Sequence, residues 1–132
     1  MCVFALAFFL AGCSGVKLES VEGKVLVDGQ PLPHGSFQFK PDVSKGNKST
    51  LEPVGLVESP GVYKIYTEKK PGAPAGWYKV VVVAQEPIDP NDLYKERKSF
   101  INGKYNSAQT TDLTIEITSA PAPGAYDLNM KK

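Results

Sequence analysis

The sequence contains few of the side chains that build metal centres or disulfide frameworks, with one histidine and two cysteines among 132 residues. Multi-histidine metal sites and zinc fingers are therefore excluded. Charge of one sign is also scarce, because fifteen lysines and arginines face fourteen aspartates and glutamates and leave a net charge of +1. This balance does not indicate the basic face that a nucleic-acid-binding domain needs. We expect no metal, no cofactor and no nucleic-acid partner.

No apolar run in the sequence reaches the length of about 20 residues that a helix needs to cross a bilayer. The run at residues 1–12 carries no charged side chain, and Cys13 follows it. Its length is typical of the apolar part of a secretory signal. The residues Leu10-Ala11-Gly12-Cys13 resemble the lipobox of bacterial lipoproteins, in which small residues admit a signal peptidase and the thiol accepts diacylglycerol. The alternative is a buried N-terminal strand or helix with an ordinary core cysteine.

The resemblance to lipoproteins implies that residues 1–12 are a signal peptide, residues 13–20 a lipidated tether and residues 21–132 the folded domain. Cys13 would carry the acyl chains, palmitate among them, and the membrane would be the first partner of the protein. More than one lipid chain is needed for stable anchoring. Ser14, rather than an aspartate, follows the cysteine, as in lipoproteins sorted to the outer membrane. We expect a secreted protein held in the cell envelope, at the outer membrane or the periplasmic face.

Turn-forming residues are abundant, with 12 glycines and 11 prolines, and they favour a β protein over a helical one. Between the turns, apolar and polar side chains alternate with the period of two that is typical of half-buried strands. Seven such segments are predicted, at residues 21–27, 35–40, 54–58, 63–67, 77–85, 113–117 and 125–130. The nearly continuous valines of the fifth segment indicate a central strand that is covered in part on both faces. The pattern predicts a seven-stranded antiparallel β-sandwich.

The one long connection, residues 86–110, contains a motif that can begin a helix. Asp89 can cap the helix, Pro90 suits its first position, and Asp92 makes its first turn acidic. This segment is compatible with a short surface helix at about residues 90–99.

The order of these motifs resembles that of bacterial transthyretin-like domains, also called carboxypeptidase regulatory-like domains. The similar segments are VEGKV at 21–25, DGQPL at 28–32, FQFKP at 37–41, GVYKI at 61–65, PAGWYKV at 74–80, KY at 104–105, LTIEI at 113–117 and YDL at 126–128. The resemblance implies a prealbumin-like sandwich that serves as a spacer, a stabilising module or a binding platform. The histidines and the C-terminal Tyr-Arg-Gly-Ser signature of 5-hydroxyisourate hydrolase are absent, so the resemblance does not carry over that activity.

Two aromatic residues are candidates for ligand contact. Trp77 and Tyr66 alternate out of phase with the apolar residues of their strands, so both are expected on the outer side of the sandwich. Exposed aromatic faces stack on sugar rings or form the centre of protein interfaces. The alternative is that Trp77 covers the connection at 86–110.

Other polar residues are interpreted as structural. His34 is a single histidine in a turn, and no Gly-x-Ser-x-Gly elbow accompanies it, so no catalytic residue is predicted. Asp89, Asn91 and Asp92 supply too few oxygens for a Ca²⁺ loop and are assigned to helix capping. Lys24 and Asn129 lie on the terminal strands, as the partners of an isopeptide bond would, but alternation places them on the solvent face.

Three functional hypotheses follow. The first is a non-catalytic, lipid-anchored envelope module with a structural or protein-binding role, whose partner would be an envelope protein. The second is a carbohydrate-binding module that binds a glycan through Trp77 and Tyr66. The third and least supported is a hydrolase.

Overall fold

A computed structural model describes residues 16–132 of the chain, and the predicted signal peptide and the lipidation site Cys13 lie outside the described residues. The described part is all-β, which confirms the predicted fold class. The seven main strands match the seven predicted segments: β1 (Glu22–Val27), β3 (Ser36–Pro41), β4 (Val54–Ser59), β5 (Val62–Thr67), β7 (Gly76–Val83), β8 (Thr114–Ile117) and β9 (Leu128–Met130). The remaining elements are short: β2 (Gln30–Pro31), β6 (Lys70–Pro71) and two 3-10 turns, η1 (Val43–Lys45) and η2 (Gly103–Asn106).

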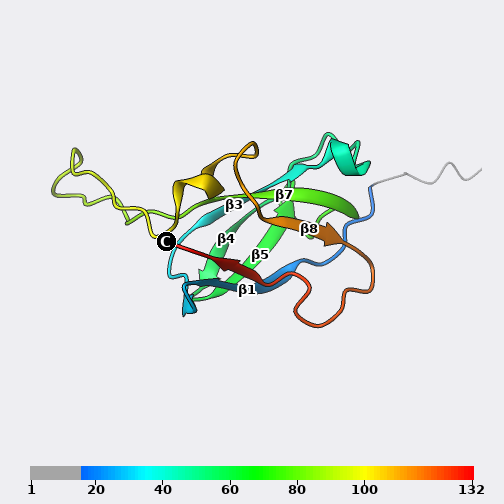
Figure 1. The fold of residues 1–132 in the computed structure, drawn as a ribbon, viewed down its shortest axis with the longest axis horizontal. Helices are drawn as coiled ribbons and strands as arrows, with labels where there is room; N and C mark the ends of the chain where they lie inside the picture. The colour runs from blue at the N-terminus through cyan, green and yellow to red at the C-terminus, as the bar shows by residue number, and fades with distance from the viewer. Residues whose placement is uncertain (1–15) are drawn as a thin grey trace, which may run out of the picture.

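The strands form one curled sheet with the order β2-β1-β5-β4-β3-β7-β8, in which every neighbouring pair is antiparallel (Figure 1). Two strands lie off this path: β6 pairs with β5, and β9 pairs with β1. The β1–β9 pair is parallel, so the prediction of an entirely antiparallel sandwich is wrong at this edge. Between residues 16 and 132, no helix is long and apolar enough to span a bilayer.

Alternation along the strands directs one set of side chains into a single core. Phe37 and Phe39 of β3 point inward together with Tyr63 of β5 and Tyr78 of β7, and all four are buried. The rings of Phe37 and Tyr63 stack with centroids 4.7 Å apart, and those of Phe39 and Tyr78 lie 5.7 Å apart. The Tyr78 hydroxyl donates a hydrogen bond of 2.8 Å to the carbonyl of Pro74, which fixes the turn before β7. The buried tyrosines thus supply both apolar area and satisfied polar groups.

The C-terminal segment lies against β1 because Gly23 has no side chain. A Cβ atom on Gly23 would come within 2.4 Å of the backbone oxygen of Tyr126. The buried Tyr63 hydroxyl donates its hydrogen bond to this same oxygen. A glycine in β1 and a hydroxyl from β5 therefore hold the entry to β9 in place.

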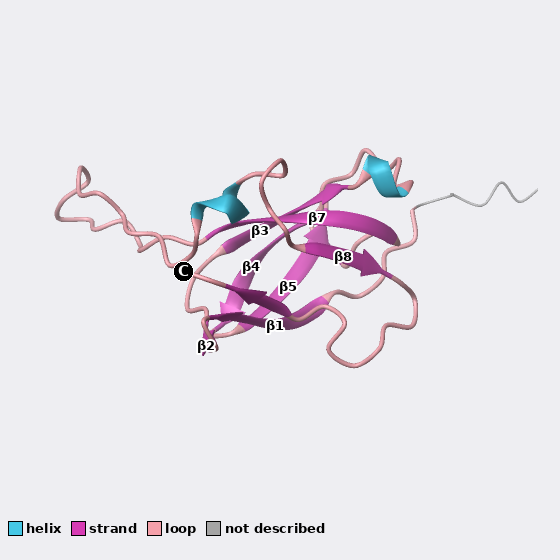
Figure 2. Cartoon of the chain, in the orientation of Figure 1, coloured by secondary structure: helices cyan, strands magenta, loops and turns pink. Residues whose placement is uncertain are grey.

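The helix expected at about residues 90–99 does not form. Residues 86–98, which we call the arm, project from the body of the molecule as an extended loop (Figure 2). Its root continues from β7: the amide of Glu86 donates to Lys98 O at 2.9 Å, and the amide of Phe100 donates to Ala84 O at 2.8 Å. At the tip, the carboxylate of Asp89 accepts from the amide of Asn91, so the polar side chain closes a turn rather than capping a helix.

The last residues of the predicted tether lie on the domain. Glu19 and Ala73 exchange two backbone hydrogen bonds of 2.8 and 2.9 Å. The folded body therefore begins at about Glu19, two residues before the predicted boundary. The chain enters the body at the end opposite to the arm (Figure 1).

Candidate functional site: an apolar outer face

The outer face of the sheet carries apolar side chains at positions that face water. Leu56 of β4 is 62% exposed, and Val54 and Val83 are exposed as well. Tyr66 of β5, which is half-buried, and Val81 of β7, which is buried, point to the same side. We call these five residues the outer patch.

The strand register brings the members of the outer patch together. Val54 lies directly opposite Tyr66 on one side and opposite Gln38 on the other, and Gln38 lies opposite Val81. In the next row, Ser36 lies between Leu56 and Val83. Because β3 contributes Ser36 and Gln38 to this face, its side chains are shorter or more polar than those beside it, and they leave the face uneven.

Two hollows result on the outer patch. One, of about 470 Å³, lies over β4 and β5 and is lined by Val54, Leu56, Glu58 and Tyr66. The other, of about 280 Å³, lies over β3 and is lined by Ser36, Gln38, Val81 and Val83 among others. Both are shallow and mainly apolar, so they suit side chains of a partner better than a reacting substrate.

A third hollow, of about 430 Å³, joins the outer patch to the root of the arm. His34, Leu56 and Val83 line it on the body, and Pro87 and Arg97 line it on the arm. The Arg97 Nε donates to the carbonyl of Glu86 at 2.6 Å, so this side chain braces the root. No carboxylate of the described residues lines the hollow to orient the exposed His34 imidazole. The histidine therefore borders the outer patch without the partner that a general base needs.

The tip of the arm is a second apolar surface. Tyr94 is 98% exposed, and Ile88 and Leu93 beside it are also exposed. The tip is turned by local bonds, because Asp92 accepts from the amide of Tyr94 at 3.3 Å. These residues cover nothing in their own molecule.

The structure places Trp77 under a different loop from the one considered in the sequence. The Lys45 Nζ of η1 lies 4.0 Å from the centroid of the indole ring, and Asn47 Nδ2 donates to the Trp77 carbonyl at 2.8 Å. The half-buried Trp77 thus packs against the loop that carries η1.

Tyr66 belongs to the outer patch, as its alternation predicted, but Trp77 does not lie beside it. The Tyr66 hydroxyl donates to Glu58 at 2.7 Å, and this hydrogen bond raises the pKa of the phenol. Tyr66 and Val81 lie in one row, three strands apart, and Trp77 is four residues further along β7. With strands about 4.8 Å apart and about 3.3 Å per residue, the two aromatics are roughly 20 Å apart. They form no common stacking platform.

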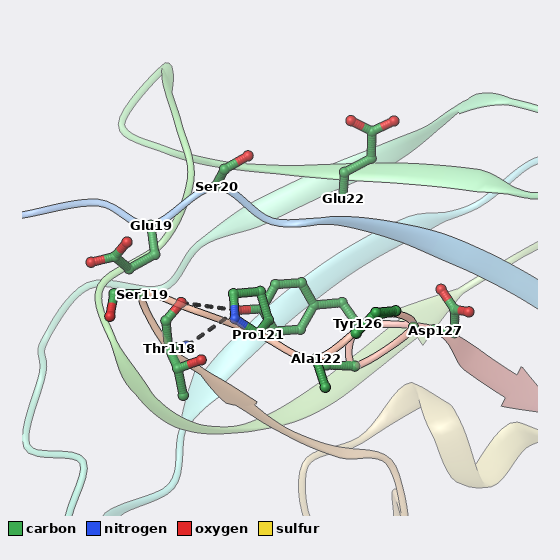
Figure 3. A pocket seen from close by; sticks show the side chains of 12 residues that line it. Glu19, Ser20, Glu22, Thr118, Ser119, Pro121, Ala122, Tyr126 and Asp127 are labelled. Carbon is green, nitrogen blue, oxygen red and sulfur yellow. Dashed lines mark hydrogen bonds between the residues drawn. The ribbon is translucent and has the colours of Figure 1, made fainter.

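A fourth hollow, of about 440 Å³, is acidic. Glu19, Glu22 and Asp127 line it, together with the loop at 118–125 (Figure 3). The carboxylates point away from one another in Figure 3, and two have partners: Asp127 accepts from the Lys24 amide at 2.9 Å, and Glu19 lies 3.4 Å from the Lys17 ammonium. Among residues 16–132, no group of three or more His, Cys, Asp or Glu side chains could hold a metal ion.

The remaining sequence candidates are dispersed. Asp89, Asn91 and Asp92 lie at the arm tip, where the aspartates close turns. Lys24 and Asn129 are both exposed, as alternation predicted.

Sequence reasoning missed the outer patch except for Tyr66. A usable signal was present, because residues 54–57 and 80–83 are apolar on both faces of their strands. Comparison of the chain with protein-family models, with curated proteins and with solved structures finds no match. The function has to be inferred from the residues of this chain.

Proposed function

We propose that this chain is a non-catalytic, lipid-anchored module of the bacterial cell envelope that binds protein through the outer patch. The single observation that carries the proposal is the apolar surface formed by the exposed Val54, Leu56 and Val83 with the half-buried Tyr66 and the buried Val81, on the two sides of Ser36 and Gln38 of β3. Contiguous apolar patches on otherwise polar surfaces mark interaction sites.

The composition of this face fits a protein interface. Tyr66 offers a broad ring whose hydroxyl is already bonded to Glu58, and Ser36 and Gln38 add polar groups within the apolar surface. Covering one aliphatic side chain such as Leu56 fully contributes about 1.5–3 kcal/mol relative to leaving it in water. An interface built in this way has an apolar centre and a polar rim.

The envelope location rests on the lipobox-like Leu10-Ala11-Gly12-Cys13 and on the order of motifs that resembles transthyretin-like lipoproteins. A transthyretin-like sandwich suits a spacer or binding platform. The position of the arm is compatible with an anchor, because the chain enters the body at one end and the arm points away from the other (Figure 1).

Protein binding is tested with a photoreactive amino acid placed at Leu56 or Val83 in the membrane-bound protein. Val43 is the matched control, because it is 72% exposed and lies on η1, away from the outer patch. We expect a protein adduct of defined mass from positions 56 and 83 that Val54→Asp abolishes, and none from position 43. The same adducts from positions 43, 56 and 83, or no adduct from any of them, would contradict binding through the outer patch.

The anchor is tested by measuring the intact mass of the protein isolated from membranes. We expect residues 1–12 to be missing and Cys13 to carry acyl chains, with Cys13→Ala found in the soluble fraction. A chain that retains Met1 and carries no acyl mass would overturn the location.

The carbohydrate alternative has one supporting observation, which is that Trp77 and Tyr66 both lie on the outer side of the sheet. Their separation leaves each to act alone. Trp77 is the only tryptophan, so fluorescence reports on this one ring. An unchanged emission during titration with envelope oligosaccharides would exclude a glycan at Trp77.

A further inference from the structure

We propose that the arm of one copy of this chain covers the outer patch of a second copy, so that two copies form a two-fold dimer by exchanging arms. The inference rests on the proposed function, since it names a partner for the same outer patch. It also gives the arm tip a role, which the proposed function leaves open.

The arm cannot cover the outer patch of its own molecule. Its root is fixed by the Glu86–Lys98 and Phe100–Ala84 backbone bonds and by the Arg97 side chain on the Glu86 carbonyl. From this root the arm runs away from the body (Figure 1). The exposed Leu93 and Tyr94 at its tip can lose their contact with water only against another molecule.

The tip and the outer patch are complementary in polarity and charge. The tip segment IDPNDLY, residues 88–94, combines three exposed apolar side chains with Asp89 and Asp92, and Lys95 follows it. On the sheet, Lys64 lies directly opposite Leu56, and Lys79 is two residues along β7 from Val81. Neither lysine lies within ion-pair distance of a carboxylate in the described part of the chain. An acidic, apolar segment is therefore a fitting occupant.

The outer patch and the arm are also continuous with each other. The hollow lined by His34, Leu56, Val83, Pro87 and Arg97 joins them on one side of the molecule. A two-fold interface needs the same surface to contribute both partners of each contact. Here each copy contributes one arm and one outer patch. Because the arm points away from its own body, it lies along the other copy only if the two-fold axis is perpendicular to the long dimension of the molecule (Figure 1). When that axis is also normal to the bilayer, both points of chain entry lie at the same height above one membrane.

The mass of the detergent-solubilised full chain, measured by sedimentation velocity over a concentration series, tests the proposal. Leu56→Asp disrupts the outer patch and Leu93→Asp with Tyr94→Asp disrupts the tip. Val43→Asp is the control, because it places a carboxylate at an exposed apolar residue away from both. We expect the parent and the control to dimerise and the other two variants to dissociate at least about tenfold more readily, as loss of an interface anchor does. Urea unfolding of each variant shows whether it remains folded.

Mixing the two variant chains distinguishes arm exchange from other forms of association. The Leu56→Asp chain keeps its arm, and the Leu93→Asp/Tyr94→Asp chain keeps its outer patch, so one contact is regained when the two are combined. We expect a mixed dimer of intermediate strength. A mixture that stays monomeric, or a parent chain that never dimerises, overturns the proposal. If the parent is monomeric but a crosslinker at Leu56 captures a different protein, arm exchange fails and the proposed function stands. If the parent chain is monomeric and the crosslinker at Leu56 captures no protein, both arm exchange and the proposed function fail.

Discussion

Tyr63 joins three parts of the fold through one buried side chain. Its ring stacks on Phe37, its edge lies over Gly23, and its hydroxyl donates to the Tyr126 carbonyl. Burial is the main cause that raises the pKa of this phenol, and the nearby Asp127 carboxylate raises it further. A single position therefore links the core to the C-terminal strand.

The close approach at Gly23 predicts that Gly23→Ala destabilises the protein. The added methyl would lie 2.4 Å from the Tyr126 oxygen, so β1 and the chain before β9 must separate. Overpacking of this kind costs about 1–3 kcal/mol of unfolding free energy, which urea titration measures. Gly103→Ala is the control, because no atom lies within 4 Å of the position that its methyl would take, and it should change stability by less than about 0.5 kcal/mol. Equal changes in unfolding free energy for Gly23→Ala and Gly103→Ala would show that the contact at Gly23 is not rigid.

The raised pKa of Tyr63 predicts a loss of stability in alkali. In the unfolded chain the phenol ionises at about pH 10, whereas in the folded chain it keeps its proton to higher pH. The protonated phenol therefore makes its full contribution to the unfolding free energy below about pH 10, and this contribution declines as the pH rises above that value. Tyr63→Phe should flatten this decline in urea titrations between about pH 8 and pH 11. A decline of the same steepness in the Tyr63→Phe variant and in the parent would contradict this role of Tyr63.

At the scale of elements, the central sheet has two apolar faces with different roles. Ile65 of β5 points into the core and is fully buried, whereas Leu56 of the adjacent β4 points outward. We predict that Leu56→Asp leaves the unfolding free energy of the monomer within about 0.5 kcal/mol, because the carboxylate stays in water. Ile65→Asp should cost more than about 4 kcal/mol, because it buries a charge without a partner. A large loss from Leu56→Asp in urea titration would mean that the outer patch is structural.

The arm should be the first element to be cut by proteases. Residues 91–99 are all exposed, and the backbone bonds at the tip, from the Asp92 amide to Asp89 O and from the Lys95 amide to Asp92 O, are local turn bonds within the arm. At concentrations too low for association, we expect chymotrypsin to cleave first after Leu93 or Tyr94 and to leave the remaining body intact by mass spectrometry. First cleavage within 54–83 would contradict the arrangement of arm and sheet.

Most of the strands could be predicted from the sequence, because alternation of apolar and polar side chains is typical of half-buried strands. The inward positions of Phe37, Phe39 and Tyr63 follow from a period of two. Alternation contains no information on the direction of a neighbouring strand, so the parallel β1–β9 pair could not be foreseen.

The helix prediction failed for a different reason. The capping residues at 89–92 are present, but no buried surface lies beside them, and a short helix needs tertiary packing to be stable. The same aspartates close turns in the loop instead. Tyr66 could be assigned to the outer face from its strand alone, whereas the outer patch depends on which strands become neighbours, and that is a property of the sheet order.

At the scale of the whole molecule, the functional surfaces lie along one direction. The chain enters at one end, the outer patch occupies the side of the sheet, and the arm extends from the opposite end (Figure 1). Because the arm points away from the end at which the chain enters, it reaches the outer patch of a second copy when the two copies lie antiparallel, side by side (Figure 1).

The most direct test of the outer patch as an occupied surface is the rate at which a maleimide labels Leu56→Cys in native membranes. Val43→Cys is the matched control, since both side chains are freely exposed in the isolated chain. We predict that position 56 reacts several-fold more slowly than position 43 in membranes, and that the two rates become equal after solubilisation and dilution. Equal rates in membranes would mean that the apolar face is left open to water, and the account of it as a binding surface would be wrong.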